Sequence, residues 1–506
     1  MVSVSSRPRR ILQGWSANLF QLLLGVTQQV ALIPVFLHFW TSDTLAAWLA
    51  LYAAGNLVLV ADSGLHLRAI NRFLAFKSSI DSDGRTARFY GAMLRIYFAL
   101  AALLIAVLLA GMSLVRPAEL LGFRATADFD LAFVVMIVGT LLILPSNLAS
   151  GLYRARGLYG RAVWLQGAAT LVALLAQLAA VATTASLLAV TIAYVAPMLL
   201  LAIYLVAIDA RRLFPFLRGV GTRASWRWSI GQFRRAFPFA IAGGTEIALQ
   251  NLPVLLVSAF VADRVAVAQW ALTRVIAGLL RALCLQTTLP LVAELGHDYA
   301  IGARGPLQRL YARGSVFVTL LAGAVVSGLL AFWPDFFALW THGAIPYDPL
   351  LTITLLIGTG VAAPSILALG FANYSDRGTL LARSKGLQLV VFLALSLALT
   401  PQMGPLGAAI AIVASDLLVQ FGLLTVVIIR QTLERPVRHL LFLAALFVFV
   451  ALAGWGLGVM IRSIAPGSGL SRFLVECGLW LAIVALAASP LASANFRNRL
   501  SDVIPR

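Results

Sequence analysis

Charged residues are scarce in this sequence. Only 11% of its 506 residues are Asp, Glu, Lys or Arg, whereas a soluble domain carries about 25%. Hydrophobic residues take their place, at 61% of the chain and a mean hydropathy of +0.93. Since one water-soluble core cannot hide such an apolar excess, the composition excludes a soluble enzyme, a disordered chain, collagen and a coiled coil. It indicates an integral membrane protein.

Cysteine, histidine and acidic residues are also rare. The two cysteines, Cys284 and Cys477, stand far apart in apolar stretches, so we expect buried thiols and no disulfide. No Cys or His spacing suits a metal and no nucleophile–base pair is visible, so we expect no metal site, no cofactor and no enzyme. The formal net charge is +19. Because the basic residues form short clusters between apolar runs, they indicate membrane orientation and contact with anionic lipid, and no nucleic acid.

Long apolar runs fill the remaining sequence. A run of roughly 20 residues spans a bilayer, and these runs are too long and too uniform for barrel strands. We therefore predict an all-α polytopic membrane protein with about 14 transmembrane helices. Their approximate centres are Leu24, Leu57, Ile105, Met136, Val172, Ala196, Leu255, Gly278, Ala322, Leu356, Leu395, Ile412, Val448 and Ile483. The prolines and the glycine in 400–405 predict a tight turn between two of these helices.

The basic residues fall on one side of this predicted topology. With a cytoplasmic N-terminus, 31 Lys and Arg face the cytoplasm and five face outwards, as the positive-inside rule requires. Both termini are then cytoplasmic. The one substantial inside connection, 209–236, is rich in Arg and Trp and follows the sixth span. No segment is long enough for a soluble catalytic domain, so we expect the function to lie between the helices, as in a transporter, channel or flippase.

The loop pattern predicts two six-helix bundles with pseudo-two-fold symmetry plus a C-terminal hairpin. The predicted parts are an N-terminal bundle at 1–208, a basic cytoplasmic linker at 209–236, a C-terminal bundle at 237–430, and a two-helix hairpin with a basic tail at 431–506.

Polar residues inside spans are costly unless they face protein or water, so they are candidates for the transport pathway. In the first span such residues form an uncharged stripe, and in the seventh Glu246 and Gln250 share one face. The members of the first-span stripe proposed for substrate contact are Asn18, Gln21, Gln28 and Gln29.

Two arginines in the eighth span are the most informative polar residues. Arg274 and Arg281 are seven residues apart and share a helix face. An arginine stays charged and costs at least ~2.5–3.5 kcal/mol at mid-span on insertion scales, so an anion must offset it. One interpretation is an anionic substrate group such as a pyrophosphate, bound bidentately. The other is a static ion pair with Glu246, and the two interpretations are compatible.

A second set of charged residues is expected to act in gating or coupling. Asp62 and His66 lie at the inner end of the second span and are followed by Arg68 and Arg72. They form either an interfacial charge cluster or a gate and proton site. Asp416 in the twelfth span is either a titrating group or a structural hydrogen-bond acceptor.

Three short motifs carry a family resemblance. The first is Leu57–Leu65 followed by Asn71-Arg72, the second is Gly151–Gly157, and the third is the G-P-L-G-A-A-I-A segment 404–411. In order and spacing they resemble the O-antigen and capsule repeat-unit flippases (Wzx-type) of the multidrug/oligosaccharidyl-lipid/polysaccharide exporter superfamily. The resemblance covers most of 11–430, while the last hairpin departs from the usual twelve spans.

The resemblance implies a V-shaped cavity that opens alternately to each side of the bacterial inner membrane. The implied substrate is an undecaprenyl-pyrophosphate-linked oligosaccharide for surface polysaccharide or lipopolysaccharide, moved at the expense of an ion gradient or the membrane potential. A polysaccharide polymerase and glycosyltransferases are the expected partner proteins, beside the membrane lipids.

Three other functions stay open. A lipid II flippase for peptidoglycan also has fourteen spans. A multidrug or cation antiporter of the same superfamily needs acidic groups in its cavity, where this chain has Arg274 and Arg281. A non-transporting scaffold of a polysaccharide synthesis complex has no need of polar stripes inside its spans.

Overall fold

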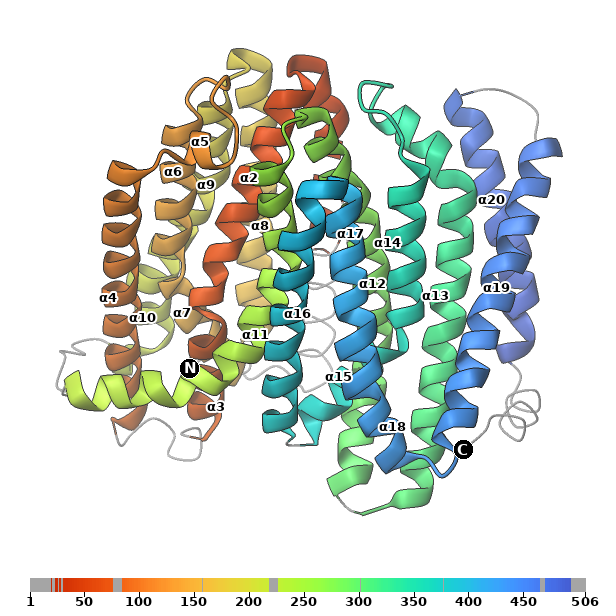
Figure 1. Cartoon of the computed structure of the whole chain (residues 1–506). Coiled ribbons are helices and arrows are strands. Elements are labelled where there is room, and N and C mark those ends of the chain that lie inside the picture. The colour runs from red at the N-terminus through yellow and green to blue at the C-terminus, as the bar shows by residue number, and fades with distance from the viewer. Residues whose placement is uncertain are drawn as a thin grey trace. The chain divides into compact units, whose positions relative to one another are not determined.

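The computed structural model describes residues 20, 23–25, 27–28, 31–75, 84–156, 158–217, 226–300, 302–375, 377–464 and 469–492. Within these ranges the regular elements are all helices (Figure 1). The chain forms two compact units, Met1–Arg264 and Val265–Arg506. The predicted boundaries at 208, 236 and 430 are not tested by this division and stay predictions.

Eleven helices within the described ranges are long and apolar enough to cross a membrane, and a bent helix pair makes twelve. These twelve match twelve of the predicted spans, which confirms a polytopic all-α membrane protein. The first predicted span, around Leu24, lies largely outside the described residues. The seventh, around Leu255, lies in α11 (Trp226–Phe260), which is helical but is not among the eleven.

In unit 1, α8 packs on α9, α9 packs on α6 and α6 packs on α2, while α3 lies against α7, and α11 lies against α2 and α3. Buried aromatic side chains, among them Phe73, Phe89, Tyr97 and Tyr153, fill its core. Its elements besides α11 are α2 (Ser42–Val58), η1 (Leu59–Ala61), α3 (Ser63–Ala75), α4 (Arg85–Leu114), α5 (Pro117–Leu120), α6 (Phe129–Ile143), α7 (Pro145–Ala155), α8 (Tyr159–Thr184), α9 (Leu187–Ile203), η3 (Tyr204–Asp209), α10 (Ala210–Leu213) and η4 (Pro215–Leu217).

Two spans of unit 1 are interrupted. In the first of them, the α-helix is interrupted by the 3₁₀ turn η1 between α2 and α3. In the second, the α-helix is interrupted at Leu144, and α7 begins at Pro145. Proline lacks an N–H, so it removes one backbone hydrogen bond and favours a new helix start. Gly64, just after the first interruption, lets α3 approach α11 closely, because a Cβ atom there would lie 2.5 Å from the carbonyl oxygen of Ala236.

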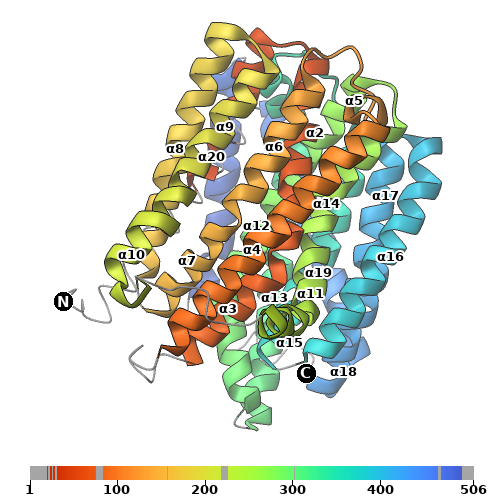
Figure 2. The same cartoon turned by 90° about the vertical axis from the view of Figure 1, so that its left-hand side faces the viewer.

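Part of the predicted linker 209–236 is helical. The first part of α11 lies across the lower end of the unit 1 helices, and the remainder rises beside them (Figures 1 and 2). A stripe spaced three or four residues apart is exposed and apolar, as expected for one face of an amphipathic helix. Its members are Trp226 (53% exposed), Ile230 (53%), Phe233 (39%) and Phe237 (59%). We call this set the α11 stripe.

Unit 2 continues the helical pattern. Gly404, with a φ of 59°, makes the turn between α16 and α17, which confirms the tight turn predicted for 400–405. The elements are α12 (Arg264–Ala300), α13 (Arg304–Trp340), α14 (Pro349–Ala362), α15 (Pro364–Tyr374), α16 (Gly378–Met403), α17 (Pro405–Ser415), η5 (Asp416–Thr425), α18 (Val426–Thr432), α19 (Pro436–Ile464), α20 (Gly469–Ala488) and η6 (Ser489–Ala492).

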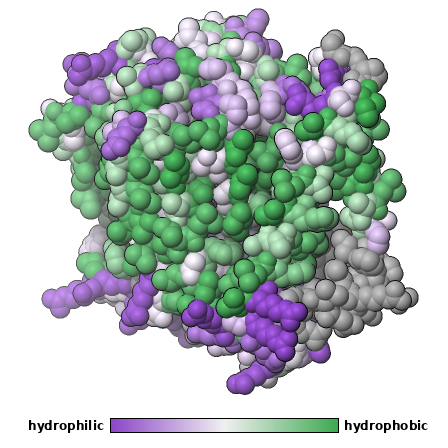
Figure 3. Space-filling model, turned by 45° about the vertical axis from the view of Figure 1, so that its right-hand side comes forward, coloured by the Kyte–Doolittle hydropathy of each residue, from purple (hydrophilic) through white to green (hydrophobic). Residues whose placement is uncertain are grey.

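The last two long helices, α19 and α20, present large apolar side chains to the outside, such as Phe449 and Leu486 at 71% exposure each. On the face drawn in Figure 3, hydrophobic residues form a broad band with hydrophilic residues above and below it. Lipid is the solvent that such a band fits. Trp480 anchors α20, since its Nε1 donates to the Gly454 carbonyl oxygen of α19 at 3.0 Å and its ring packs on Gly328 of α13.

Candidate functional site

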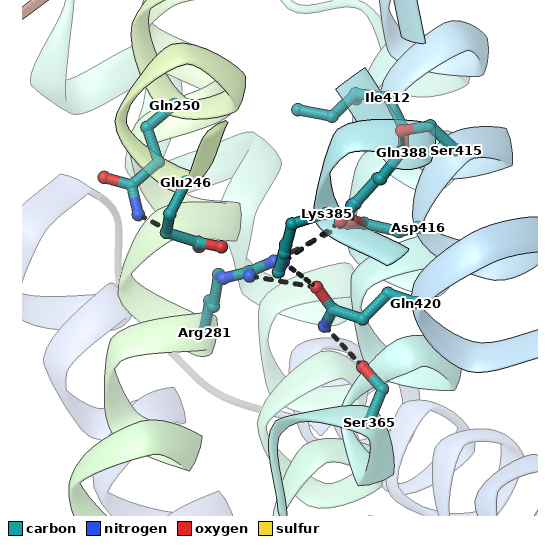
Figure 4. A network of polar contacts seen from close by, with 10 residues as sticks. All are labelled: Glu246, Gln250, Arg281, Ser365, Lys385, Gln388, Ile412, Ser415, Asp416 and Gln420. Carbon is teal, nitrogen blue, oxygen red and sulfur yellow. Dashed lines mark hydrogen bonds and ion pairs between the residues drawn. The ribbon is translucent and has the colours of Figure 1, made fainter. Parts of the chain in front are cut away.

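Unit 2 encloses a cluster of polar side chains contributed by α12, α15, α16 and η5 (Figure 4). Five of the six are buried, and Arg281 is partly exposed. We call them the unit 2 cluster, which consists of Arg281 on α12, Ser365 on α15, Lys385 and Gln388 on α16, and Asp416 and Gln420 on η5.

Lys385 is the centre of this cluster. Its side chain is 2% exposed, and its Nζ donates to Gln388 Oε1 at 3.0 Å and to Gln420 Oε1 at 2.5 Å. The amide of Gln420 in turn donates to Ser365 Oγ at 2.6 Å, and the amide of Gln388 donates to Asp416. Buried amides and hydroxyls thus solvate this ammonium group in place of water.

Arg281 shares the same acceptors. Its Nη1 lies 3.6 Å from Asp416 Oδ2 and its Nη2 lies 3.5 Å from Gln420 Oε1. Two basic side chains, Arg281 and Lys385, thus accompany the one carboxylate of the cluster, Arg281 by direct contact and Lys385 through Gln388. Arg274, seven residues before Arg281, adds to the positive potential, since the two guanidinium groups interact electrostatically. The cluster carries an excess of positive charge, which suits an anion.

Local helix geometry brings these residues together. Lys385 and Gln388 are three apart on α16 and so share a face. Asp416 opens η5, a π-helical segment in which hydrogen bonds span five residues, and such segments are frequent at functional sites. Ser365 follows Pro364, where the pair α14 and α15 bends by 48°.

Unit 1 contains a second buried polar cluster, which lies at its two interrupted spans. Asp62, 6% exposed, accepts hydrogen bonds from the Tyr97 hydroxyl of α4 and from Asn147 Nδ2 of α7, the latter at 2.6 Å. His66 Nδ1 lies 3.1 Å from the carbonyl oxygen of Asn147. We call Asp62, His66, Tyr97 and Asn147 the unit 1 cluster.

Other charged residues of unit 1 tie helices together. Arg161 binds Asp209 through two hydrogen bonds of 2.7 and 3.1 Å, and Tyr153 also donates to this carboxylate. Arg156 Nη1 donates to the Phe73 carbonyl oxygen at 2.7 Å. The motif 151–157 thus contributes Tyr153 and Arg156 to packing. Arg68 donates to Gln232 of α11 at 2.6 Å, while Arg72 lies in the last turn of α3.

The predicted site residues fall into separate places. Arg281 and Asp416, predicted for different roles, contact each other in the unit 2 cluster, and Asp62 and His66 belong to the unit 1 cluster. Gln250 donates to Glu246 at 3.4 Å. The predicted pairing of Glu246 with Arg274 and Arg281 stays a prediction. Gln28 is partly buried, while Asn18, Gln21 and Gln29 lie outside the described residues.

Sequence reasoning missed Lys385, Gln388, Ser365, Tyr97 and Asn147. The charge count includes Lys385 among the 31 cations of the cytoplasmic side, but α16 begins at Gly378 and Lys385 is buried within it. Lys385 follows Arg377 and Arg383 closely in the sequence, so it resembles a residue of a basic loop. The spacing of Lys385 and Gln388 was the one available signal, since a lysine and an amide three residues apart can hydrogen-bond on a helix.

Comparisons with known proteins agree with this architecture. No family model and no curated protein matches the chain. The lipid II flippase MurJ, in an inward closed conformation, gives a TM-score of 0.71 at 11% identity and covers 95% of this chain and 100% of its own. An inward-facing multidrug resistance MATE family transporter of the MOP superfamily gives 0.64 at 14%, covering 79% and 92%.

A third similar structure is a MOP superfamily transporter from Pyrococcus furiosus Vc1, described as having a binding pocket of reverse polarity that suggests a different function. It gives a TM-score of 0.53 at 15% identity, covering 82% of this chain and 92% of its own. The chain is a multi-pass membrane protein with the fold of these transporters. The fold that the sequence motifs implied is thus confirmed, whereas membership of the superfamily and its polysaccharide-specific part stay predictions.

Proposed function

We propose that the chain is a flippase for an undecaprenyl-pyrophosphate-linked oligosaccharide. It moves this lipid by alternating access from the cytoplasmic to the outer leaflet of the bacterial inner membrane, for surface polysaccharide or lipopolysaccharide biosynthesis. The fold supports a membrane transporter. The single observation that supports an anionic substrate is the unit 2 cluster, in which two cationic side chains accompany one carboxylate: Arg281 contacts Asp416, and Lys385 is linked to it through Gln388.

The geometry of the unit 2 cluster suggests how an anion is taken up. Arg281 is the partly exposed member, with its side chain 24% exposed, so it is the group that an entering pyrophosphate meets first. Phosphate oxygens bind a guanidinium group bidentately, whereas the contact of Arg281 with Asp416 is long at 3.6 Å. Substrate then replaces Asp416 at Arg281, and Lys385 keeps Asp416 and Gln420 in place.

The proposal keeps the remaining assignments made from the sequence. Glu246, Gln250 and the first-span amides contact the sugar and its linkage, and Arg274 extends the anion site. Asp62, His66, Arg68 and Arg72 act in gating and coupling. Both termini lie in the cytoplasm, and a polysaccharide polymerase and glycosyltransferases are the partners.

A lipid II flippase is the second candidate, supported by a fold likeness to MurJ that extends over 95% of this chain. A cation antiporter fits less well, because an excess of positive charge in the unit 2 cluster repels cationic drugs.

A lipid analysis of a strain that lacks the protein tests the proposal. We expect the lipid-linked oligosaccharide to accumulate on the cytoplasmic face while surface polysaccharide disappears. Wild-type protein and Arg313→Ala restore both, since Arg313 is an exposed arginine of α13 outside the cluster, and Arg281→Ala at normal protein level does not. Accumulated lipid II supports the second candidate. Unchanged lipids with increased retention of cationic dyes contradict both and support the antiporter.

A further inference from the structure

Asp62 is a buried carboxyl group surrounded by neutral donors. Its two oxygen atoms accept hydrogen bonds from the Tyr97 hydroxyl and from Asn147 Nδ2. Among the described residues, no Lys or Arg side chain forms an ion pair with it. The other buried carboxylates in the described part of the chain differ, since Asp209 binds Arg161, Glu476 binds Arg472 and Asp416 contacts Arg281.

A buried carboxylate without a paired cation is costly, and in proteins such a group commonly takes up a proton. The titratable group nearest to Asp62 on its own helix is His66, with which it interacts electrostatically. Arg154 of α7 interacts electrostatically with His66. Arg72 of α3 and Arg235 of α11 interact electrostatically with Arg68. On α4 the facing group is Tyr97. Within the described ranges, the one charged group with an electrostatic effect on Asp62 is therefore His66.

The position of Asp62 gives its charge structural consequences. It is the C-cap of the interruption η1 and directly precedes α3, and its backbone carbonyl accepts from the His66 N–H at 3.1 Å. Asn147 lies just after the other interruption, with its own N–H bonded to the Leu144 carbonyl oxygen at 3.0 Å. One side-chain hydrogen bond, Asn147 to Asp62, therefore joins two interrupted spans.

We propose that Asp62 is a proton-binding site and that its protonation state sets how the two interrupted spans are held together. The ionised carboxylate accepts from both Tyr97 and Asn147. A protonated carboxyl group donates one hydrogen bond instead, and the Asn147 amide can turn its oxygen toward it. Since His66 Nδ1 faces a carbonyl oxygen, this nitrogen carries a hydrogen, which leaves Nε2 free to pass a proton.

The arrangement around Asp62 favours a proton over a metal ion. A sodium ion needs several oxygen ligands, whereas both groups aimed at Asp62 in this structure, the Tyr97 hydroxyl and the Asn147 amide nitrogen, act as hydrogen-bond donors. The proposal rests on the proposed transport function only where it concerns coupling to a proton gradient. Proton binding itself is measurable on the purified protein.

Infrared difference spectroscopy of the full chain in lipid nanodiscs, at high and low pH, tests the proposal. We expect a titrating carboxylic-acid band in the wild type and in Asp43→Asn, which removes an exposed carboxyl group on the neighbouring helix α2. Asp62→Asn should lack this band. Tyr97→Phe should keep the band with its titration midpoint moved to higher pH, because the charged form loses a donor.

Two results overturn the proposal. The first is an unchanged titrating band in Asp62→Asn. The second is an unmoved titration midpoint of that band in Tyr97→Phe, a variant that retains Asp62 and so decides the question if Asp62→Asn folds poorly. In proteoliposomes, a proton gradient should accelerate transport by wild-type protein, while a sodium gradient alone should not. Acceleration by sodium alone contradicts proton coupling. A wild type that moves no lipid-linked oligosaccharide defeats the proposed function, yet leaves the infrared result to decide on Asp62.

Discussion

The charge arrangement of the unit 2 cluster predicts an unequal response to two substitutions. Lys385→Met removes one of two cations and leaves the Arg281–Asp416 contact neutral. Asp416→Asn removes the one carboxylate of the cluster and leaves the partly exposed Arg281 and the buried Lys385 around the same acceptor, Gln420. We therefore expect the second variant to unfold much more easily than the first, although each changes one charge.

The distances give the size of this difference. At an effective dielectric constant of about 20, two unit charges 3.6 Å apart attract by about 4–5 kcal/mol. Removing one partner of such a buried pair costs about 3–5 kcal/mol. Lys385→Met loses two hydrogen bonds, to Gln388 and Gln420, at about 1.5–3 kcal/mol each. Because Lys385→Met no longer buries a surplus cation, the saved desolvation free energy offsets much of this loss. We therefore expect a net cost of about 1–2 kcal/mol.

Equilibrium unfolding in mixed micelles measures both free energies, and the double variant completes a thermodynamic cycle. Lys385→Met/Asp416→Asn removes one charge of each sign, so its cost should be smaller than the sum of the single costs. The reasoning is refuted if Lys385→Met is the more destabilising change, or if the two costs simply add. Arg313→Met on the exposed face of α13 is the matched control.

Further predictions concern packing between helices. Gly64→Val should destabilise unit 1 by about 1–3 kcal/mol, since a Cβ atom at this position meets the Ala236 backbone at 2.5 Å. Thermal melts check this, with Gly25→Ala as the control, because a Cβ atom at Gly25 has nothing within 4 Å. Trp480→Ala should loosen α20 at a cost of about 3–5 kcal/mol, seen as faster proteolysis after the α19–α20 connection. Equal proteolysis of Trp480→Ala and Trp455→Ala, at an exposed tryptophan of α19, contradicts the anchoring role.

The membrane topology was predictable because it depends on features that the sequence displays directly. Apolar length located twelve helices that the structure contains, and two prolines with Gly404 located the turn between α16 and α17. Both of these follow from local chemistry and need no tertiary information.

The polar clusters were only half predictable, because their other members come from distant segments. Asp62 and His66 could be recognised, but their partners Tyr97 and Asn147 lie 35 and 85 residues after Asp62. Lys385 was misplaced because charge counting assigns cations near a span end to the loop. Whether a cation near a span end is buried depends on where the helix starts. The sequence around one lysine and its amide partners does not reveal that position.

The first part of α11 has a consequence for the access of protons to Asp62. A helix with an exposed apolar stripe and arginines beside it settles at the level where hydrocarbon meets headgroups. Gln232, on this helix, bonds Arg68, so this turn of α3 sits at the edge of the bilayer. Asp62 is six residues earlier, about 9 Å along the helix axis, with His66 between them. A proton from the nearby aqueous phase thus has only two helical turns to travel, and one side chain on the way can relay it.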